Sequence, residues 1–189
     1  MTLKEALRLI ACSLLLWLLV LLPAADRHLA QAASSPKAAP RAARTPLDAD
    51  GRMHFSAEDR CPVCAMRATT NPKFTSAIEL RDGRTFYFCG TGCMIRSWLH
   101  PEVFLNVTKK DLRRAVVQDY FSGEHVDAMD VYWVAGSDVV GPMGPALVPL
   151  KSKGDLNAFQ RRHGGTTIFR LADMTPEKWQ DITGKKSRP

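Results

Sequence analysis

Four cysteines in two closely spaced pairs are the residues of this sequence best suited to chemistry. Cys61 and Cys64 form a Cys-x-x-Cys pair, and Cys89 and Cys93 form a second pair with three residues between them. Two such pairs, joined by a hairpin-sized segment, are typical of a small metal-binding knuckle. The sequence therefore predicts that these four thiols hold a metal ion.

Four other side chains extend the set of candidate ligands. Met66 and Met94 lie next to the cysteine pairs, Met143 is held in a Gly-Pro-Met-Gly-Pro loop, and His163 precedes Gly-Gly. Four thiolates alone suit structural zinc, whereas thiolate and thioether together select Cu(I). Any of these methionines can instead fill a gap in the core, although the rigid loop favours presentation of Met143. His163 can equally cap its helix as a cation.

Two hypotheses for the cysteines that do not involve copper remain open. In an exported protein, bridges within the pairs Cys61–Cys64 and Cys89–Cys93 would give a disulfide-stapled scaffold. A thiol oxidoreductase using the Cys61-Pro-Val-Cys64 pair is less favoured, because such a pair normally begins a helix and Asn71-Pro72 soon follows. A zinc- or disulfide-stapled interaction module is thus the alternative to a copper carrier.

Short strands and helices must position these ligands. We expect strands at 74–80 and 85–89 around an Asp-Gly turn, strands at 112–120, 127–135 and 166–171, and helices at 92–99, 155–163 and from 175. Thr91 is the expected cap of the first helix, and residues 141–145 should form a tight loop without regular structure. The fold class is α+β, with antiparallel β-hairpins each followed by a short helix. Two small similar subdomains would fit this order, although no sequence repeat supports them.

Composition excludes several classes of protein. The chain has 189 residues, of which 46% are hydrophobic and 24% charged, as in globular proteins and unlike collagen-like, coiled-coil or wholly disordered chains. Its formal net charge of +7 is spread along the chain, which suits an acidic partner better than nucleic acid. Because no catalytic triad, phosphate loop or acid–base pair of carboxylates is evident, we expect no enzyme activity.

The amino terminus carries the features of an export signal. Lys4 and Arg8 precede an uncharged apolar stretch at 9–25, and Ala30-Gln31-Ala32 provides a small-x-small site. We expect residues 1–32 to be a signal peptide cleaved after Ala32, or else an uncleaved anchor in the inner membrane through 9–25. Either form places the folded part in the periplasm. A flexible linker at 33–52, a metal-binding domain at 53–183 and a tail at 184–189 would follow.

The order of motifs resembles the NosL family of nitrous-oxide reductase accessory proteins. The likeness covers roughly residues 59–173 and rests on these motifs: Cys61-Pro-Val-Cys64-Ala-Met66, Phe86-Tyr-Phe88, Gly92-Cys93-Met94, Val134-Ala-Gly136-Ser137-Asp138, Gly141-Pro-Met143-Gly144 and His163-Gly-Gly165. This resemblance implies a periplasmic Cu(I) chaperone that helps to mature the copper centres of nitrous-oxide reductase. It also implies an ABC-type maturation complex with a periplasmic subunit as partner, and Met143 as a copper ligand.

The sequence departs from the family pattern at three points. Family members are often lipoproteins with a lipidated cysteine at the end of the signal, whereas Cys12 lies near the front of the apolar stretch. Ala65 stands where glycine is common, and Cys89 gives a fuller set of thiols. The extra thiol leaves open whether the cysteines hold one structural metal with a separate copper site at Met143 and His163, or one shared cluster.

Overall fold

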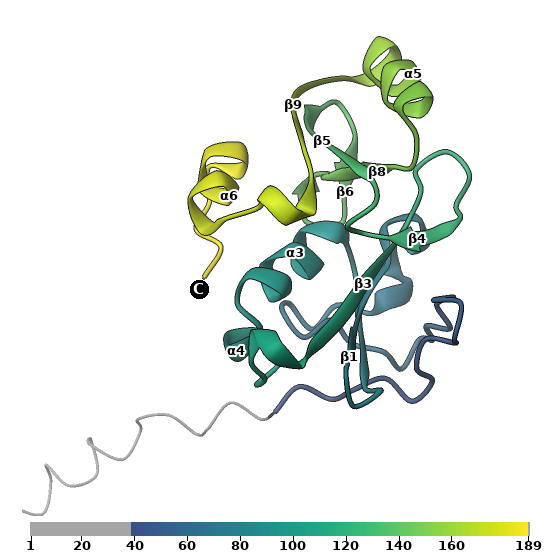
Figure 1. Cartoon of the computed structure of the whole chain (residues 1–189), viewed down its shortest axis with the longest axis vertical. Helices are drawn as coiled ribbons and strands as arrows, with labels where there is room; N and C mark the ends of the chain where they lie inside the picture. Colours follow the sequence, from purple (N-terminus) through teal and green to yellow (C-terminus); the bar gives the residue numbers. More distant parts are fainter. Residues whose placement is uncertain (1–38, 189) are drawn as a thin grey trace, which may run out of the picture. The chain divides into compact units, whose positions relative to one another are not determined.

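A computed structural model describes residues 39–188, which form an α+β fold with antiparallel sheets (Figure 1). This confirms the predicted fold class. The first sheet has the strand order β2-β1-β3-β4. Its strands are β1 (Ser76–Leu80), β2 (Thr85–Phe88), β3 (Leu112–Gln118) and β4 (His125–Asp127). The second sheet has the order β8-β5-β9, with β5 (Tyr132–Ser137), β8 (Val148–Leu150) and β9 (Gly164–Phe169).

The strands and the helix of each sheet follow one another along the chain in the same order. In each, a hairpin of two strands is followed by a helix, and the next strand then returns to pair with the free side of the first strand. The helices concerned are α3 (Thr91–Leu99) and α5 (Lys153–His163). The orders β2-β1-β3 and β8-β5-β9 therefore correspond strand for strand, which matches the expected pair of similar units without any repeat in the sequence.

Short elements complete the fold. Helix α4 (Pro101–Phe104) follows α3 directly, and α6 (Pro176–Thr183) lies near the carboxyl terminus. The hydroxyl of Thr175 accepts the Lys178 N–H at 3.2 Å and so caps α6. A small hairpin of β6 (Val140–Gly141) and β7 (Gly144–Pro145) projects between β5 and β8. The prediction that residues 141–145 lack regular structure was wrong, because these strands pair across a tight turn.

Two other expectations need correction. The run 127–135 was predicted as one strand, yet β4 ends at Asp127 and β5 begins at Tyr132. The Asp127 carboxylate accepts the Met129 N–H at 2.8 Å, which closes a local turn that the apolar composition of the run did not reveal. Thr91 is the first residue of α3 rather than its cap, and its hydroxyl donates to the Leu147 carbonyl at 2.7 Å.

One large apolar cluster joins α3 to both sheets. Ile78 and Phe88 of the first sheet, Trp133 and Phe169 of the second, and Ile95 of α3 all belong to it and are at most 4% exposed. The rings of Trp133 and Phe169 stack with centroids 6.0 Å apart, and the Trp133 indole donates to the Ala128 carbonyl at 3.0 Å. Three of the four candidate cysteines are buried in this cluster, namely Cys61, Cys89 and Cys93.

The described part of the predicted linker 33–52 lies along the first sheet. The Leu47 N–H donates to the Thr85 hydroxyl at 3.1 Å, and the Leu47 side chain is 6% exposed. The Arg114 guanidinium donates to the Asp48 carbonyl at 2.8 Å. Residues 39–52 therefore pack on the domain through the buried Leu47 and through Ala42 and Ala43, which contact the apolar clusters.

The predicted signal or anchor at 1–32 lies outside the described residues. Within the described range 39–188, no helix has the length and hydrophobicity needed to cross a membrane.

Candidate metal centre

The four cysteines predicted to bind metal lie together in the structure. Their Sγ atoms all lie within 4.8 Å of one another, and all four are free thiols. The Sγ atoms of Cys64 and Cys89 are 3.3 Å apart, and those of Cys89 and Cys93 are 3.9 Å apart. A tetrahedron with metal–sulfur distances of about 2.3 Å has sulfur–sulfur edges of about 3.8 Å. The cluster therefore has the dimensions of a metal site before any metal binds.

A tight turn presents the first pair. The Cys61 N–H donates to the Met66 carbonyl and the Ala65 N–H donates to the Cys61 carbonyl, both at 2.9 Å. Ala65 has a φ of 61°, in the left-handed region that glycine adopts without cost. This conformation explains why glycine would be common at the position, and the two hydrogen bonds explain how alanine is held there. Cys61 is buried by the turn, while Cys64 is half-buried.

A strand-to-helix junction presents the second pair. Cys89 directly follows β2, and Cys93 is the third residue of α3. Gly90, the N-terminal cap of α3, has extended backbone, and its carbonyl accepts the Cys93 N–H at 3.2 Å. Both thiols are at most 3% exposed and face the turn that carries the first pair.

Hydrogen bonds among the thiols shift the pKa values of the two cysteine pairs in opposite directions. Hydrogen bonds from neighbouring thiols, Cys61 first, hold the pKa of Cys64 far below its ordinary value. The hydrogen bond to Cys64 raises the pKa of Cys61, but those from the second pair outweigh it, so the pKa is lowered overall. The thiols of the first pair raise the pKa of Cys89 and of Cys93. The hydrogen bonds therefore favour the thiolate form in the first pair and the thiol form in the second.

The environment of Cys93 differs from what its sequence position suggested. It does lie in the first turn of α3, where the helix dipole favours a thiolate. Its pKa is nevertheless raised, because its proton is shared in hydrogen bonds with the other three sulfurs and the thiol is buried. The hydrogen bonds within the cluster and the burial therefore raise the pKa of Cys93 by more than the helix N-terminus lowers it.

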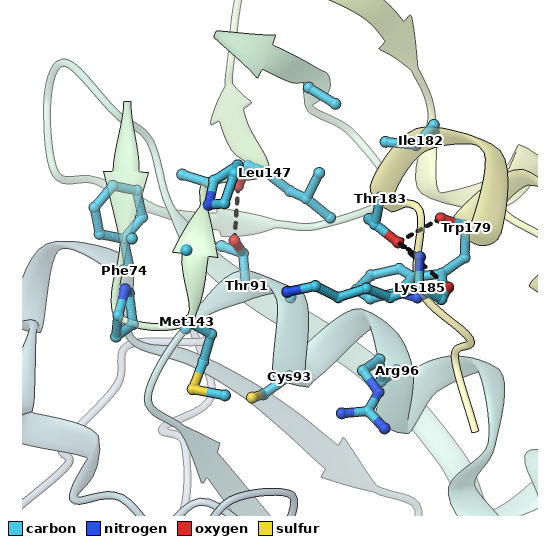
Figure 2. Close-up of a pocket in the computed structure, with 18 of the residues that line it drawn as sticks. Phe74, Thr91, Cys93, Arg96, Met143, Leu147, Trp179, Ile182, Thr183 and Lys185 are labelled. Atoms are coloured by element: carbon cyan, nitrogen blue, oxygen red, sulfur yellow. Dashed lines mark hydrogen bonds between the residues drawn. The ribbon is translucent and has the colours of Figure 1, made fainter. Parts of the chain in front are cut away.

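Met143 lies beside the cluster, in the turn of the β6–β7 hairpin. It lines an open pocket of about 370 Å³ together with Cys93, and Figure 2 shows the ends of the two side chains extending toward each other. A Cβ atom added at Gly90 would lie 2.9 Å from the Pro142 Cγ, so the hairpin packs closely against the junction that carries the second pair. With 49% of its surface exposed, Met143 is presented to solvent rather than packed in the core.

The other predicted ligands lie in different surroundings. Met94 is fully buried in the apolar cluster, and Met66 is half-buried against it. His163 ends α5, its Nδ1 is 2.9 Å from an Asp138 carboxylate oxygen, and its ring lies 4.8 Å from that of Phe159. His163 neither lines the pocket nor belongs to the cysteine group.

Three residues that sequence reasoning did not single out also shape the pocket. Arg96 is one helical turn after Cys93 on α3, a spacing that places both on one face and was a usable signal. Trp179 of α6 and Lys185 of the carboxyl-terminal tail line the opposite wall. No pattern in the sequence links those two residues to the cysteines, because only the tertiary fold brings α6 to α3.

A family model and a curated relative match this chain to the same protein family. The NosL family model matches residues 52–179. A relative described as a copper-binding lipoprotein NosL, from Stutzerimonas stutzeri, is 33% identical over 118 residues. That match covers 60% of this chain and 61% of the relative. The chain thus spans less than two thirds of the relative's length.

One solved structure supports the same fold, and a second resembles a smaller part of the chain. The crystal structure of the copper chaperone NosL from Shewanella denitrificans has a TM-score of 0.57 and 21% identity, with 70% of this chain and 99% of that chain covered. The solution structure of the apo-NosL protein from Achromobacter cycloclastes has a TM-score of 0.41 and 22% identity, covering 55% of this chain and 87% of that one. On the strength of the family match over most of its described residues, this chain belongs to the NosL family.

Proposed function

We propose that this protein is a periplasmic Cu(I) chaperone that delivers copper for maturation of the nitrous-oxide reductase copper centres. The observation that carries the proposal is the meeting of four free thiols within 4.8 Å, with the Met143 thioether lining the same pocket as Cys93. Thiolate and thioether sulfur are soft ligands that select Cu(I) over the harder metal ions. Membership of the NosL family and the name of the copper-binding relative support the same metal.

The exposure of the donors fits a carrier rather than a permanent metal site. Cys64 is half-buried and Met143 is 49% exposed, while the other three thiols are buried. An incoming ligand can replace the exposed donors first, while the buried thiolates keep hold of the ion. Copper can then pass to a partner by ligand exchange, without change of oxidation state and without an enzymatic step.

The proposed compartment follows from the amino-terminal sequence and from the lipoprotein relative. A signal at 1–32, cleaved or kept as an anchor, would place the domain in the periplasm. The proposed partners are nitrous-oxide reductase and the periplasmic subunit of its ABC-type maturation complex.

A competition titration tests copper binding. The reduced full-length protein, in a Cys12→Ser background, is loaded with Cu(I) and titrated with a chromophoric Cu(I) chelator under anaerobic conditions. We expect near-stoichiometric retention of copper, and an affinity about tenfold lower in Met143→Leu, equivalent to about 1.4 kcal/mol. Met129→Leu, which removes a half-buried thioether elsewhere on the apolar cluster, is the matched control and should bind like the parent. Loss of copper to a weak chelator, or equal affinities for all three proteins, would reject the proposal.

A complementation experiment tests delivery. In a host that lacks its own NosL protein, the parent chain should restore the copper content of nitrous-oxide reductase, and Cys61→Ser should not. Restoration by Cys61→Ser would show that the cluster is not the delivery site.

A zinc-stapled interaction module is the second candidate, because the four thiols also fit a tetrahedral zinc site. Metal analysis after expression with both metals distinguishes the two candidates. Zinc at one equivalent that Cu(I) does not displace, with no effect of Met143→Leu, would favour the module.

A further inference from the structure

The pocket beside Cys93 and Met143 has features that metal binding alone does not require. It extends from the sulfur atoms across α3 to α6 and to the carboxyl-terminal tail (Figure 2). Its lining includes two cations, Arg96 and Lys185, and no acidic residue. Within residues 39–188, neither cation forms an ion pair with a carboxylate. The two cations therefore make the pocket a positive surface without a paired carboxylate among the described residues.

The β6–β7 hairpin, several residues of which line the pocket, carries exposed apolar side chains. Four large hydrophobic residues are exposed in the described part of the chain, and two of them, Val140 and Met143, belong to the β6–β7 hairpin. Exposed apolar groups next to unpaired charges are typical of a surface that a protein partner covers. The hairpin is held at the metal site by the close approach of Pro142 to Gly90, so a partner on this surface would also reach the copper ligands.

From these features, and building on the function proposed above, we propose that the pocket receives an acidic loop of the copper-exchange partner that also carries a thioether or imidazole donor. The carboxylate of the loop pairs with Lys185 and Arg96, and its soft donor reaches the space between Met143 and Cys93. A second copy of this chain is disfavoured as occupant, because the formal net charge of +7 makes two copies repel each other.

The exchange step balances without an oxidant or reductant. The bond between Cu(I) and the Met143 sulfur breaks as a bond to the incoming thioether or neutral imidazole forms, and copper remains Cu(I). No proton moves in that step. When a cysteine thiolate is released later, it takes up a proton from water.

Arg96 and Lys185 differ as targets for mutation. The Arg96 Nε donates to the Ser187 carbonyl at 2.8 Å, and its guanidinium lies 4.9 Å from the Phe104 ring centroid, so its removal would disturb the tail. Lys185 is exposed, and its ammonium group makes no ion pair within residues 39–188. Lys186 is equally exposed but does not line the pocket. Lys185→Glu and Lys186→Glu therefore change net charge by the same amount at adjacent positions.

Peptide binding to the full-length protein tests the proposal. The probes are a fluorescein-labelled hexapeptide with two aspartates flanking one methionine, the same peptide with norleucine for methionine, and one with lysines for the aspartates. With the Cu(I)-loaded protein, we expect the acidic methionine peptide to bind at least tenfold more tightly than either control. Lys185→Glu should weaken its binding at least fivefold, and Lys186→Glu less than twofold.

Several results would overturn this inference. They are equal binding of the three peptides, no measurable binding, equal effects of the two lysine variants, or burial of the pocket in a dimer during sedimentation. Preferential binding to phosphatidylglycerol vesicles that Lys185→Glu abolishes would assign the surface to a membrane instead. A protein that holds Cu(I) but shows any of these results refutes the docking surface alone, whereas failure to hold Cu(I) refutes the proposed function itself.

Discussion

Cys64 differs from the three cysteines around it in exposure, and from Cys89 and Cys93 also in the direction of its pKa shift. It is half-buried, and hydrogen bonds from the neighbouring thiols hold its pKa far below the ordinary value. Cys89 and Cys93 are almost completely buried, and their pKa values are raised by hydrogen bonds with the first pair. Because the accessible thiolate is the reactive form, one of four chemically identical residues should dominate the reactivity of the cluster.

We predict that iodoacetamide at pH 7 alkylates Cys64 well before the other three cysteines of the metal-free protein. Peptide mass spectrometry over a time course measures the order of modification, in a Cys12→Ser background. Bound Cu(I) should protect all four thiols, because each thiolate is then a ligand or is shielded by one. Simultaneous modification of the four, or first reaction at Cys93, would contradict the electrostatic description of the cluster.

At the residue scale, the sequence identified the cysteines because their spacing is local and characteristic. It also predicted the presentation of Met143, since two prolines and two glycines restrict that loop. It could not predict that Met94 is fully buried or that His163 contacts Asp138, because both depend on packing between distant segments. Lys185 was missed for the same reason, whereas the helical spacing of Arg96 from Cys93 was a signal that went unused.

At the element scale, one close contact connects the β6–β7 hairpin to the second cysteine pair. Gly90 has no Cβ, and the Pro142 ring occupies the space that a Cβ would need, with 2.9 Å between them. The backbone of Gly90 is extended, so alanine is tolerated there apart from this contact. The glycine therefore sets the distance between Met143 and the cluster.

We predict that Gly90→Ala displaces the hairpin, weakens Cu(I) binding about fivefold to tenfold, and lowers the free energy of unfolding by about 1–2 kcal/mol. Gly154→Ala is a suitable control, because its new Cβ would meet only the Ser152 hydroxyl, at 3.6 Å. Chelator competition and chemical denaturation measure the two effects. An unchanged affinity in Gly90→Ala would show that the hairpin does not position a copper ligand.

The amino-terminal segment is attached to the first sheet partly through a histidine. The Met53 N–H donates to Nδ1 of His125 at 2.9 Å. Burial lowers the pKa of His125, with further lowering by Arg52 and His54 and a smaller opposite effect of Asp48. Protonation of Nδ1 would remove the acceptor, so the folded state disfavours the charged form.

We predict that this segment loosens on acidification. Because the folded pKa lies below the unfolded value of about 6.5, the unfolded chain takes up the proton first as pH falls, and the free energy of unfolding decreases from about pH 7 downward. His125→Gln removes this contribution, so its stability should fall less than that of the parent between pH 7.5 and pH 5.5. Denaturant unfolding of the metal-free protein at both pH values measures the difference. His100, whose pKa is also lowered, is present in both proteins and contributes equally to both pH profiles. If the free energy of unfolding falls by the same amount in the parent and in His125→Gln, the role of His125 is contradicted.

Two element boundaries with a local signal were predicted correctly, whereas the cap expected at Thr91 was not. The Asp-Gly turn between β1 and β2 and the start of α6 at Thr175-Pro176 were both located correctly. The single strand predicted at 127–135 failed, because the strand-forming residues after Asp130 were extended back across the turn that the Asp127 carboxylate closes at Met129. The short strand β8 was missed, since Val148–Leu150 contains a proline that usually argues against a strand.

At the scale of the whole molecule, the proposed metal site takes its ligands from both of the similar units. The cysteines come from the turn before the first sheet and from the β2–α3 junction, while Met143 comes from a hairpin inserted between two strands of the second sheet. A copper ion bound by the cysteines and by Met143 would add a link between units that otherwise meet through the shared apolar cluster. Metal loading should therefore stabilise the whole domain.

We predict that excess Cu(I) raises the free energy of unfolding, by about 4 kcal/mol when free copper is a thousand times its dissociation constant. Met143→Leu should reduce this increment but leave the metal-free protein nearly unchanged, because its side chain is half exposed. Thermal unfolding with and without metal measures both values. A reduced stability of the metal-free variant together with an unchanged increment would show that Met143 acts in folding instead.

The most direct test of the central claim is X-ray absorption at the copper edge of the Cu(I)-loaded protein and its Met143→Leu variant. We predict a Cu(I) edge and a first shell made of sulfur alone in the parent, with one sulfur fewer in the variant. A shell containing nitrogen or oxygen donors, or identical sulfur shells in the two proteins, would contradict a copper site built from the cysteine cluster and Met143.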